Sequence, residues 1–273
     1  MTGHRGAASG PASTADDRIT ALAEALWKAE QSRRAIPPII KGDPDLTVGD
    51  AYRIQLTNIK RKLAAGARIM GRKVGLTSRA MQSMMGVNEP DFGVLLDDMF
   101  VEEGDAVPVA DLVQPRVEAE IALVLGRGLR GPGVSSTAAL RCVESAVASI
   151  EIIDSRIEDW KIGLIDTIAD NASSARFVVA ARRTPVDGID LRLTGMALSI
   201  NGELLETGAG AAVLGNPARC LAWLANKLAT FDEELEAGDI VLAGALHRAI
   251  PVKPGDSVVA EFDRLGSVRT RFT

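Results

Sequence analysis

The chain has 273 residues, 47% of them hydrophobic and 25% charged, which are ordinary values for a globular protein with a sizeable core. The net charge is −5 and aromatic residues make up only 4%, so nucleic acid is not an expected partner. With only two cysteines and no apolar run long enough to span a membrane, we expect a reduced, cytoplasmic protein without membrane contact.

The first part of the chain is predicted to be helical. Residues 1–15 are small, polar and rich in Gly, Pro and Ser, which is typical of a flexible leader. Apolar residues then recur at helical spacing over residues 16–32, and a second helix begins at Thr47 and stops at Gly66. We therefore expect residues 16–67 to form a helical N-terminal subdomain.

Residues 68–273 are predicted to form a mixed-β catalytic domain, which makes the fold class α+β. A short strand over 68–77 precedes a loop-rich stretch to Asp105, and strands over 116–126 and 148–156 flank a helix over 137–148. Asn201–Gly202 suits the turn of a hairpin, and Asn216 begins a helix that ends near Ala229. The remaining strands are expected at 239–243, 248–252, 257–262 and 267–272.

The glycine pattern argues against a nucleotide-binding fold. No GxGxxG sequence follows a strand and opens a helix. The Gly-rich run at 208–215 lacks that spacing and also lacks the Lys–Ser/Thr pair of a phosphate-binding loop. It fits either a tight turn before a helix or a segment that lines a substrate site.

Two glutamates in one apolar strand are the first sign of chemistry. In the strand over 116–126, Glu118 and Glu120 share one face and lie roughly 6–7 Å apart. Adjacent buried carboxylates repel each other, and a bound Mg²⁺ or Mn²⁺ would reverse that cost. The alternative is a strand whose glutamates face solvent. Glu151 lies among isoleucines in the next predicted strand, so these three acids could hold one cation together.

Other polar residues are candidates for acid–base or binding roles. Lys73, between glycines, could move a proton or pair with a substrate carboxylate, or it could be an ordinary surface lysine. Asp97 and Asp98 could act as acid or base, or could cap a local turn. The DNASS segment offers short hydrogen-bonding groups that also suit a turn. His247 stands alone between predicted strands, and no Ser/His/Asp or Cys/His set is present.

Long, ordered motifs give the chain a resemblance to a known family from about Asp16 onwards. It resembles the 2-hydroxypenta-2,4-dienoate (2-keto-4-pentenoate) hydratases of the fumarylacetoacetate hydrolase superfamily. The motifs are GRKVGLTSRAMQSMMGVNEPDFGVLLDDM, QPRVEAEIALVLG, EIIDSRIEDW, DTIADNASS, GAGAAVLGNP with WLANKL, GDIVLAG and GDSVVAEFDRLGSV.

The resemblance implies a fold, a cofactor and a set of site residues. It implies a β-sandwich roll, an Mg²⁺ or Mn²⁺ cofactor, a homo-oligomer with ring-like symmetry, and a place in meta-cleavage degradation of aromatic or steroid rings. Association with the next enzyme of that pathway is a further expectation. The residues it implies are metal ligands Glu118, Glu120 and Glu151, catalytic groups Lys73 with Asp97 or Asp98, and substrate contacts Leu95, Asp170, Asn171 and Ser173.

Several activities share this pattern. The main hypothesis is a hydro-lyase that converts 2-hydroxypenta-2,4-dienoate, or a 5-substituted analogue, to a 4-hydroxy-2-oxo acid. One alternative is a 2-oxo-3-hexenedioate (4-oxalocrotonate) decarboxylase. Another is a 2-oxohept-4-ene-1,7-dioate hydratase, which needs a cation for its second carboxylate, with Arg72, Arg176 and His247 as candidates. The last is a non-catalytic partner subunit, which has no physical need for three acids on apolar strands.

Overall fold

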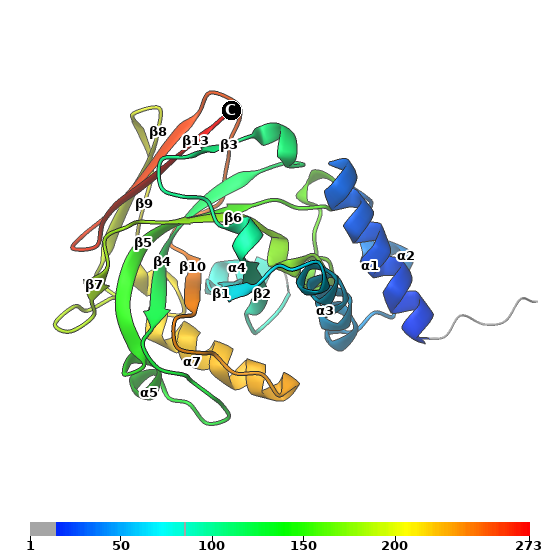
Figure 1. The fold of residues 1–273 in the computed structure, drawn as a ribbon, viewed down its shortest axis with the longest axis horizontal. Coiled ribbons are helices and arrows are strands. Elements are labelled where there is room, and N and C mark those ends of the chain that lie inside the picture. Colours follow the sequence, from blue (N-terminus) through cyan, green and yellow to red (C-terminus); the bar gives the residue numbers. More distant parts are fainter. Residues whose placement is uncertain (1–14, 85) are drawn as a thin grey trace, which may run out of the picture.

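A curved β-sheet crosses the middle of the molecule, with helices on one side and a second sheet on the other (Figure 1). The structure is a computed structural model that describes residues 15–84 and 86–273. The α-helices are α1 (Ala15–Ser32), α2 (Ile39–Gly42), α3 (Val48–Ala64), α4 (Arg79–Met84), α5 (Ser136–Leu140), α6 (Leu164–Ala169) and α7 (Pro217–Leu228). The strands are β1 (Ile69–Gly75), β2 (Asp91–Leu96), β3 (Ala106–Val107), β4 (Arg116–Leu125), β5 (Val143–Ile153), β6 (Ser174–Val179), β7 (Thr184–Pro185), β8 (Gly195–Ile200), β9 (Glu203–Ala209), β10 (Ile240–Ala245), β11 (Ile250–Pro251), β12 (Ser257–Phe262) and β13 (Gly266–Phe272).

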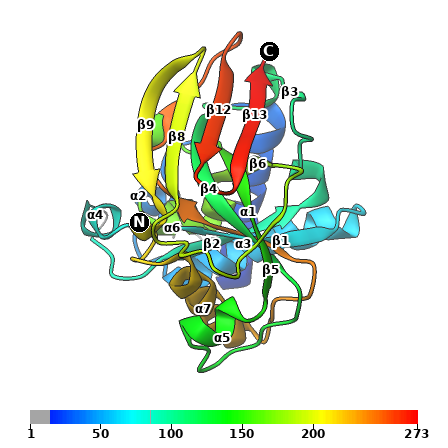
Figure 2. The same cartoon turned by 90° about the vertical axis from the view of Figure 1, so that its left-hand side faces the viewer.

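The larger sheet has eight strands in the order β2-β1-β10-β4-β5-β6, with β11 beside β4 and β7 beside β5. Its pairs are antiparallel except for β1 and β10, which run parallel. The smaller sheet has the order β3-β13-β12-β8-β9 and lies against the larger one through β12 and β13, which contact β5 (Figure 2). The two sheets thus meet over the strand that carries Glu151.

Burial along the strands follows from these layers. Strands β8, β12 and β13 alternate between buried and more exposed residues, because only one of their faces meets the larger sheet. Strands β4 and β5 are buried on both faces over most of their length. Helix α7 packs against β10 and α5, which covers the lower end of the larger sheet (Figure 1). Apart from the exposed Glu144 near the start of β5, the polar side chains on β4 and β5 are therefore largely enclosed by protein.

The N-terminal helices are joined to the sheet through α3, which packs on α1 and α6. Thr47 caps α3 in a reciprocal capping box with Asp50. Tyr52 stacks on Phe92 of β2 with ring centroids 4.6 Å apart. The buried Gln55 side chain donates to the carbonyl of Phe92 at 3.0 Å and to that of Ile168 at 2.9 Å. One α3 side chain therefore links β2 to α6.

Most elements confirm the sequence predictions. The α+β class, the helices over 16–32 and 47–66, the Asn201–Gly202 hairpin, the helix that Asn216 caps and the four C-terminal strands are all present. The leader prediction for residues 1–15 falls mostly on residues 1–14, outside the described residues; Ala15 belongs to α1. The domain division at residue 68 stays a prediction.

Two element predictions were wrong. The helix over 137–148 is helical only in α5, and β5 begins at Val143. The stretch to Asp105 is not only loop, because it contains β2, whose six residues are all buried. Both errors concern strands without an alternating pattern, since they are buried on both faces.

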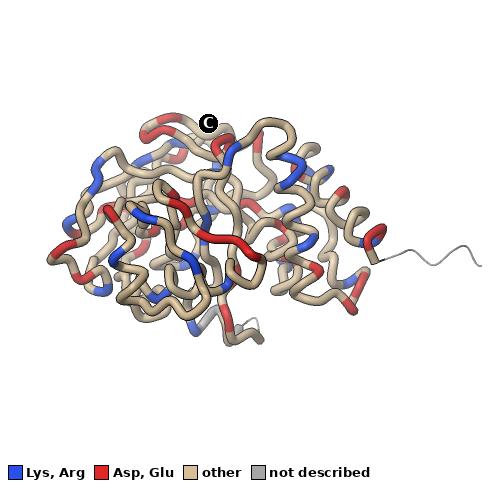
Figure 3. Tube along the Cα trace, turned by 60° about the horizontal axis from the view of Figure 1, so that its bottom comes forward, with Lys and Arg blue, Asp and Glu red and all other residues tan. Residues whose placement is uncertain are grey.

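Three further features concern charge, cysteines and membrane-spanning helices. Acidic and basic residues are interspersed along the trace in Figure 3. Cys142 and Cys220 are free thiols. Over the described residues, none of the helices combines the length and apolar character that a membrane crossing requires.

Candidate metal centre and active-site pocket

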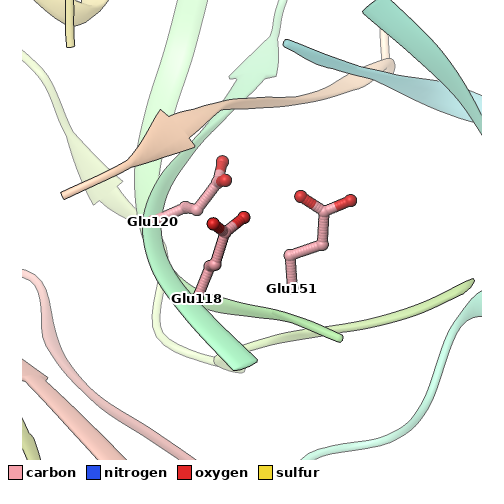
Figure 4. Close-up of side chains that lie close together, drawn as sticks. All are labelled: Glu118, Glu120 and Glu151. Atoms are coloured by element: carbon pink, nitrogen blue, oxygen red, sulfur yellow. The ribbon is translucent and has the colours of Figure 1, made fainter. Parts of the chain in front are cut away.

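Three glutamates converge where β4 pairs with β5. Strand β4 places Glu118 and Glu120 on one face, and the antiparallel ladder pairs Glu118 directly with Glu151 of β5. One potential ligand oxygen from each residue lies within 4.8 Å of the others. Figure 4 shows the three side chains pointing toward one another. The sequence prediction that these acids share one site therefore has the geometry that it needs.

The carboxylates of this cluster have more negative charge than their protein partners offset. Burial, opposed by the Lys73 ammonium, raises the pKa of Glu118 to about 7. Burial and the charges of Glu151 and Glu118 raise the pKa of Glu120 well above its usual value. The Oε2 atom of Glu151 is buried and accepts no hydrogen bond. Three crowded oxygen donors, one of them without a hydrogen bond, fit a hard divalent cation.

A bulge in β10 supplies one of the few protein donors to the cluster. The register of β10 on β4 shifts between Leu242 and Ala245, which leaves the Gly244 amide pointing at Glu120 Oε2, 2.7 Å away. Gly244 has φ +118°, and a Cβ there would lie 2.4 Å from the Thr77 hydroxyl. Only glycine suits both the backbone conformation and the space.

Lys73 lies at the same site and is fully enclosed. Its Nζ donates to the carbonyl of Ala172 at 2.8 Å and lies 3.3 Å from Glu151 Oε2. Burial lowers the pKa of Lys73, but the surrounding carboxylates of Glu151, Asp91, Glu118 and Glu120 outweigh burial and hold the pKa above its usual value. Lys73 is thus an ammonium ion that faces the glutamates, and the surface-lysine alternative is wrong.

Asp91 is a site residue that the sequence analysis missed. It is the first residue of β2 and is 1% exposed. Thr167 donates to its Oδ2 at 3.3 Å, whereas its Oδ1 is buried without a partner. Burial raises the pKa of Asp91, and Lys73 opposes that rise. The available signal was an acid directly before the apolar run FGVLL, since an acid beside a buried strand is seldom solvated.

A left-handed turn carries the backbone group that binds Lys73. Asn171, Ala172 and Ser173 have φ values of 54°, 50° and 55°. This conformation costs roughly 1–2 kcal/mol for each such residue. The Asn171 side chain offsets part of the cost, because it accepts from the Val94 amide at 2.8 Å and donates to the Val94 carbonyl at 3.0 Å. Asn171 thus stabilises the turn by bonding it to β2.

The DNASS residues divide between two cavities. Ser173 lines the glutamate pocket, and its hydroxyl is buried without a hydrogen-bond partner. Asp170 is buried against Arg156, which donates to it from the backbone nitrogen at 2.9 Å and from Nε at 2.5 Å. Asp170 and Asn171 line a second cavity beside the N-terminal helices. Of the three residues, the structure brings only Ser173 to the glutamates.

Asp97, Asp98 and Leu95 also lie apart from the glutamate pocket. Asp97 and Asp98 form a 3₁₀ turn after β2, are exposed, and line the second cavity. Asp97 Oδ1 accepts from the Arg68 amide at 2.9 Å. Leu95 is fully buried in β2 and does not line either cavity. Asp97 thus binds a backbone amide just before β1, and both the catalytic and the turn-capping predictions for this pair stay predictions.

His247 fills a gap in the sheet. Its Nε2 accepts from the Ala119 amide at 2.8 Å, and its Nδ1 lies 2.6 Å from the Arg248 carbonyl, to which it must donate. Burial lowers the pKa of His247, which favours the same neutral tautomer. The ring therefore satisfies a β4 amide between the two short stretches where β4 pairs with β10 and β11.

The glutamate pocket, which is lined by Glu118, Glu120, Lys73, Asp91, Ser173 and His247, has a volume of about 700 Å³. Charged and polar groups lie beside an apolar wall that includes Val74, Ile153, Ile162 and Leu246. Ala212 of the Gly-rich run also lines it, directly before α7, so that run is both a turn and part of the wall. The volume is suited to a small organic acid.

Comparison with known proteins gives matches over nearly the whole chain. A family model described as fumarylacetoacetate (FAA) hydrolase C-terminal matches residues 55–273. The 2-keto-4-pentenoate hydratase of Paraburkholderia xenovorans (strain LB400) is 45% identical over 250 residues, which cover 92% of this chain and 93% of that protein. The 4-oxalocrotonate decarboxylase of Pseudomonas sp. (strain CF600) is 41% identical over 256 residues, which cover 94% and 97%.

A solved structure is also similar over almost its full length. The 4-oxalocrotonate decarboxylase from Pseudomonas putida G7, complexed with magnesium and adipate, superposes with a TM-score of 0.93 at 39% sequence identity. The match covers 96% of this chain and 99% of that one.

Proposed function

Because the chain belongs to the fumarylacetoacetate hydrolase family, we propose that it is a hydro-lyase that adds water to 2-hydroxypenta-2,4-dienoate or a 5-substituted analogue. The product is a 4-hydroxy-2-oxo acid. The observation that carries the proposal is the cluster of Glu118, Glu120 and Glu151 beside a pocket of about 700 Å³, which Glu118 and Glu120 line together with Lys73 and Asp91.

The glutamate cluster is the proposed metal site. Glu118, Glu120 and Glu151 would hold one divalent cation, and their all-oxygen donor set favours Mg²⁺ or Mn²⁺. When bound, such a cation polarises the 2-oxygen of the acid and offsets negative charge that develops there.

Asp91 is the proposed proton donor, and Lys73 is the proposed electrostatic partner of the 2-oxygen. The dienol first becomes an α,β-unsaturated ketone: the 2-hydroxyl releases its proton to solvent as the acid binds, carbon 5 gains the proton of Asp91, and Asp91 regains a proton from solvent. Asp91 is suited to donate at carbon 5, since burial favours its protonated form and its Oδ1 has no other partner. Lys73 stays cationic and would stabilise the negative 2-oxygen. Asp97 and Asp98 are thereby replaced by Asp91 in this proposal.

Water addition completes the reaction. The hydroxyl joins carbon 4 and a proton joins carbon 3, so the atoms of one water molecule enter the product. Ser173 is suited to orient that water, because its buried hydroxyl has no partner in the protein. The apolar wall keeps bulk water from the reacting carbons.

The deciding experiment supplies chelator-stripped protein with freshly generated 2-hydroxypenta-2,4-dienoate, with and without Mg²⁺ or Mn²⁺. Loss of the dienol absorbance is followed, and the product is identified. Metal-dependent formation of 4-hydroxy-2-oxopentanoate supports the proposal. If no product forms with either metal from this acid or its 5-substituted analogues, the hydratase proposal is wrong.

A decarboxylase is the second candidate. It is supported by the similarity to the Pseudomonas decarboxylases in sequence and in structure. The divalent cation that the same glutamates would hold, together with Lys73, would stabilise the negative charge of the dienolate that loss of carbon dioxide leaves behind. Release of carbon dioxide from 2-oxo-3-hexenedioate, without hydration of the pentadienoate, would select this activity.

Assembly into a homo-oligomer is part of the proposal, as is association with the next pathway enzyme. Leu204 and Leu205 of β9 are 58% and 39% exposed on the outer strand of the smaller sheet. Such exposed leucines favour contact with another protein surface. Light scattering of the purified protein measures the assembly size directly.

A further inference from the structure

The glutamate pocket contains an arginine, Arg116, that is attracted by Glu118 of the same strand but forms no ion pair with an acid among the described residues. Three residues with cationic side chains line this pocket: Lys73, Arg116 and Arg248. Lys73 is paired with Glu151, and Arg248 donates to Glu206 at 2.6 Å. Among the described residues, the Arg116 guanidinium makes no hydrogen bond or ion pair, although it is half-buried.

The residues that the sequence suggested as cationic partners of a second substrate carboxylate are not available for that role in the glutamate pocket. Arg72 lies outside the pocket and pairs with Glu233 at 2.8 Å. Arg176 lines the other cavity. His247 lines the glutamate pocket, but its hydrogen bonds hold it in the neutral form. Arg116 is therefore the guanidinium that remains available to a ligand of this pocket.

The Arg116 guanidinium lies over the indole ring of Trp160. The guanidinium carbon lies 4.5 Å from the centre of the ring. A cation–π contact uses none of the N–H donors in a hydrogen bond, so these donors stay available to a planar anion. A carboxylate matches that edge with two parallel hydrogen bonds.

The local backbone is built to place Trp160. Asp159 and Trp160 both have left-handed φ values, 55° and 54°, which L-residues other than Asn and Asp adopt rarely. The indole N–H donates to the Gln114 carbonyl at 3.1 Å, and the Gln114 side chain in turn donates to the carbonyls of Ser155 and Ile157. Strain that is held by such a network and lies at a pocket wall points to a function of the residue it positions.

Register places Arg116 beside the glutamates. It lies two residues before Glu118 in β4, so both side chains leave the same face of the strand, roughly 7 Å apart. An acid bound at the glutamates is thus within reach of the guanidinium edge.

We propose that Arg116, held against Trp160, binds a carboxylate of the acid substrate through its free N–H donors, with Trp160 as the positioning residue. The proposal rests on the proposed function only in that the substrate is an acid. It adds the group that recognises that acid. The carboxylate is either the one next to the 2-oxo group or a second one at the far end of the molecule.

The two possible carboxylates can be distinguished by measuring the binding of 2-oxo acids that the enzyme does not turn over. Calorimetry of the Mg²⁺-loaded full chain would compare 2-oxoadipate with 2-oxohexanoate, which have the same chain length and differ in the second carboxylate. Arg116→Gln is expected to weaken binding by about 10- to 100-fold, the usual effect of losing hydrogen bonds to a charged group. Loss for both acids assigns the carboxylate next to the oxo group, and loss for 2-oxoadipate alone assigns the distal one.

Matched variants control for charge and folding. Arg176→Gln removes a half-buried cation from the other cavity and is expected to change both affinities less than twofold. Trp160→Leu is expected to reproduce part of the Arg116→Gln loss, and Trp160→Phe to restore it, because phenylalanine keeps an aromatic face. Arg116→Lys keeps the charge without the fork and is expected to lie between wild type and Arg116→Gln.

Several measurable results would contradict the proposed role of Arg116. The proposal is wrong if neither acid binds the wild type, or if Arg116→Gln weakens neither acid more than twofold. It is equally wrong if Arg116→Gln changes the affinity for Mg²⁺ alone by the same factor, because Arg116 would then only balance the charge of the glutamates. Loss of acid binding in Arg116→Gln, together with a wild type inactive on every dienoate, would leave this inference standing and remove the proposed function.

Discussion

Glu118 and Glu151 stand directly opposite each other on the β4–β5 ladder. Like charges at such a position destabilise a sheet. Lys73 forms an ion pair with Glu151 at 3.3 Å, whereas among the described residues Glu118 has no ion pair with a basic side chain. The pair is therefore a poor choice for stability alone and a good one for binding a cation.

Neutralising the cluster should separate metal binding from folding. Glu118→Gln and Glu120→Gln are expected to abolish Mg²⁺ binding and activity while the chain stays folded, because each keeps the side-chain shape and removes a charge. In chelator, both variants should melt at or above the wild-type temperature at pH 8, since a buried charge is gone. Calorimetric Mg²⁺ titration and thermal melts measure these effects. Metal-dependent turnover in both variants would contradict the site assignment.

The metal-free protein should lose stability as the pH rises. Burial raises the pKa of Glu118 from 4.5 to about 7, so the folded chain holds this proton more tightly than the unfolded chain does. The contribution is present below pH 4.5 and is lost as the pH rises through about 7, up to about 3 kcal/mol. Denaturant midpoints in EDTA should fall between pH 5 and pH 8, and saturating Mg²⁺ should remove the decline. A flat profile in EDTA would argue against the raised pKa.

Gly75 leaves the space that the Asp91 carboxyl occupies near the Lys73 ammonium. A Cβ at this position would lie 2.2 Å from Asp91 Oδ1 and 3.6 Å from Lys73 Nζ. Gly75→Ala should displace the Asp91 carboxyl and lower kcat on the order of 100-fold, as misplacement of a reacting group by about 1 Å does. Gly42→Ala is the matched control, because a Cβ there has no atom within 4 Å. Equal kcat values for the two variants would argue against a catalytic Asp91.

His247 should matter for stability. His247→Ala leaves the Ala119 amide without its acceptor, which costs about 1–3 kcal/mol for a buried donor. His247→Gln keeps a side-chain acceptor and should recover part of the loss. Urea denaturation of the Mg²⁺-loaded protein measures the difference. A pH-dependent kcat that disappears in both variants, without loss of stability, would instead indicate a proton-transfer role.

Asn171 should act on the site through the turn that it holds. Asn171→Ala removes both hydrogen bonds to Val94 and releases the left-handed turn whose Ala172 carbonyl binds Lys73. We expect a loss of about 1–3 kcal/mol in stability and a lower kcat with KM nearly unchanged. Steady-state kinetics and denaturation of the same preparation check this. A large rise in KM with unchanged stability would favour the earlier prediction that Asn171 contacts the substrate.

The sequence predicted the site residues whose charge is unusual for the apolar segment in which they lie. Glu118, Glu120 and Glu151 are acids within aliphatic strands, and Lys73 lies in a strand between glycines, so pattern and chemistry both marked them. Asp91 was missed because β2 is short and apolar throughout, and it was read as loop. Asp97 and Asp98 are a conspicuous acidic pair, but they face the other cavity.

The pattern of a single sequence could not predict which residues, far apart in the chain, become neighbours across the sheet. The parallel pairing of β1 with β10 brings Lys73 beside Leu242, far away in the sequence. The Arg116–Trp160 contact joins the start of β4 to a strained turn after β5. The mistaken helix over 137–148 has the same cause as the missed β2, because strands buried on both faces lose the alternation that identifies a strand.

The family match begins at Gln55, in the middle of α3. That side chain binds the carbonyls of Phe92 and Ile168, which follow Asp91 and Thr167 directly in the chain. The hydrogen-bonded pair of Asp91 and Thr167 is thus held from behind by a helix that the matched region includes only from Gln55 onwards. A shift of α3 relative to β2 and α6 would therefore move the Asp91 carboxyl, so the packing of the N-terminal helices and the position of this acid are coupled.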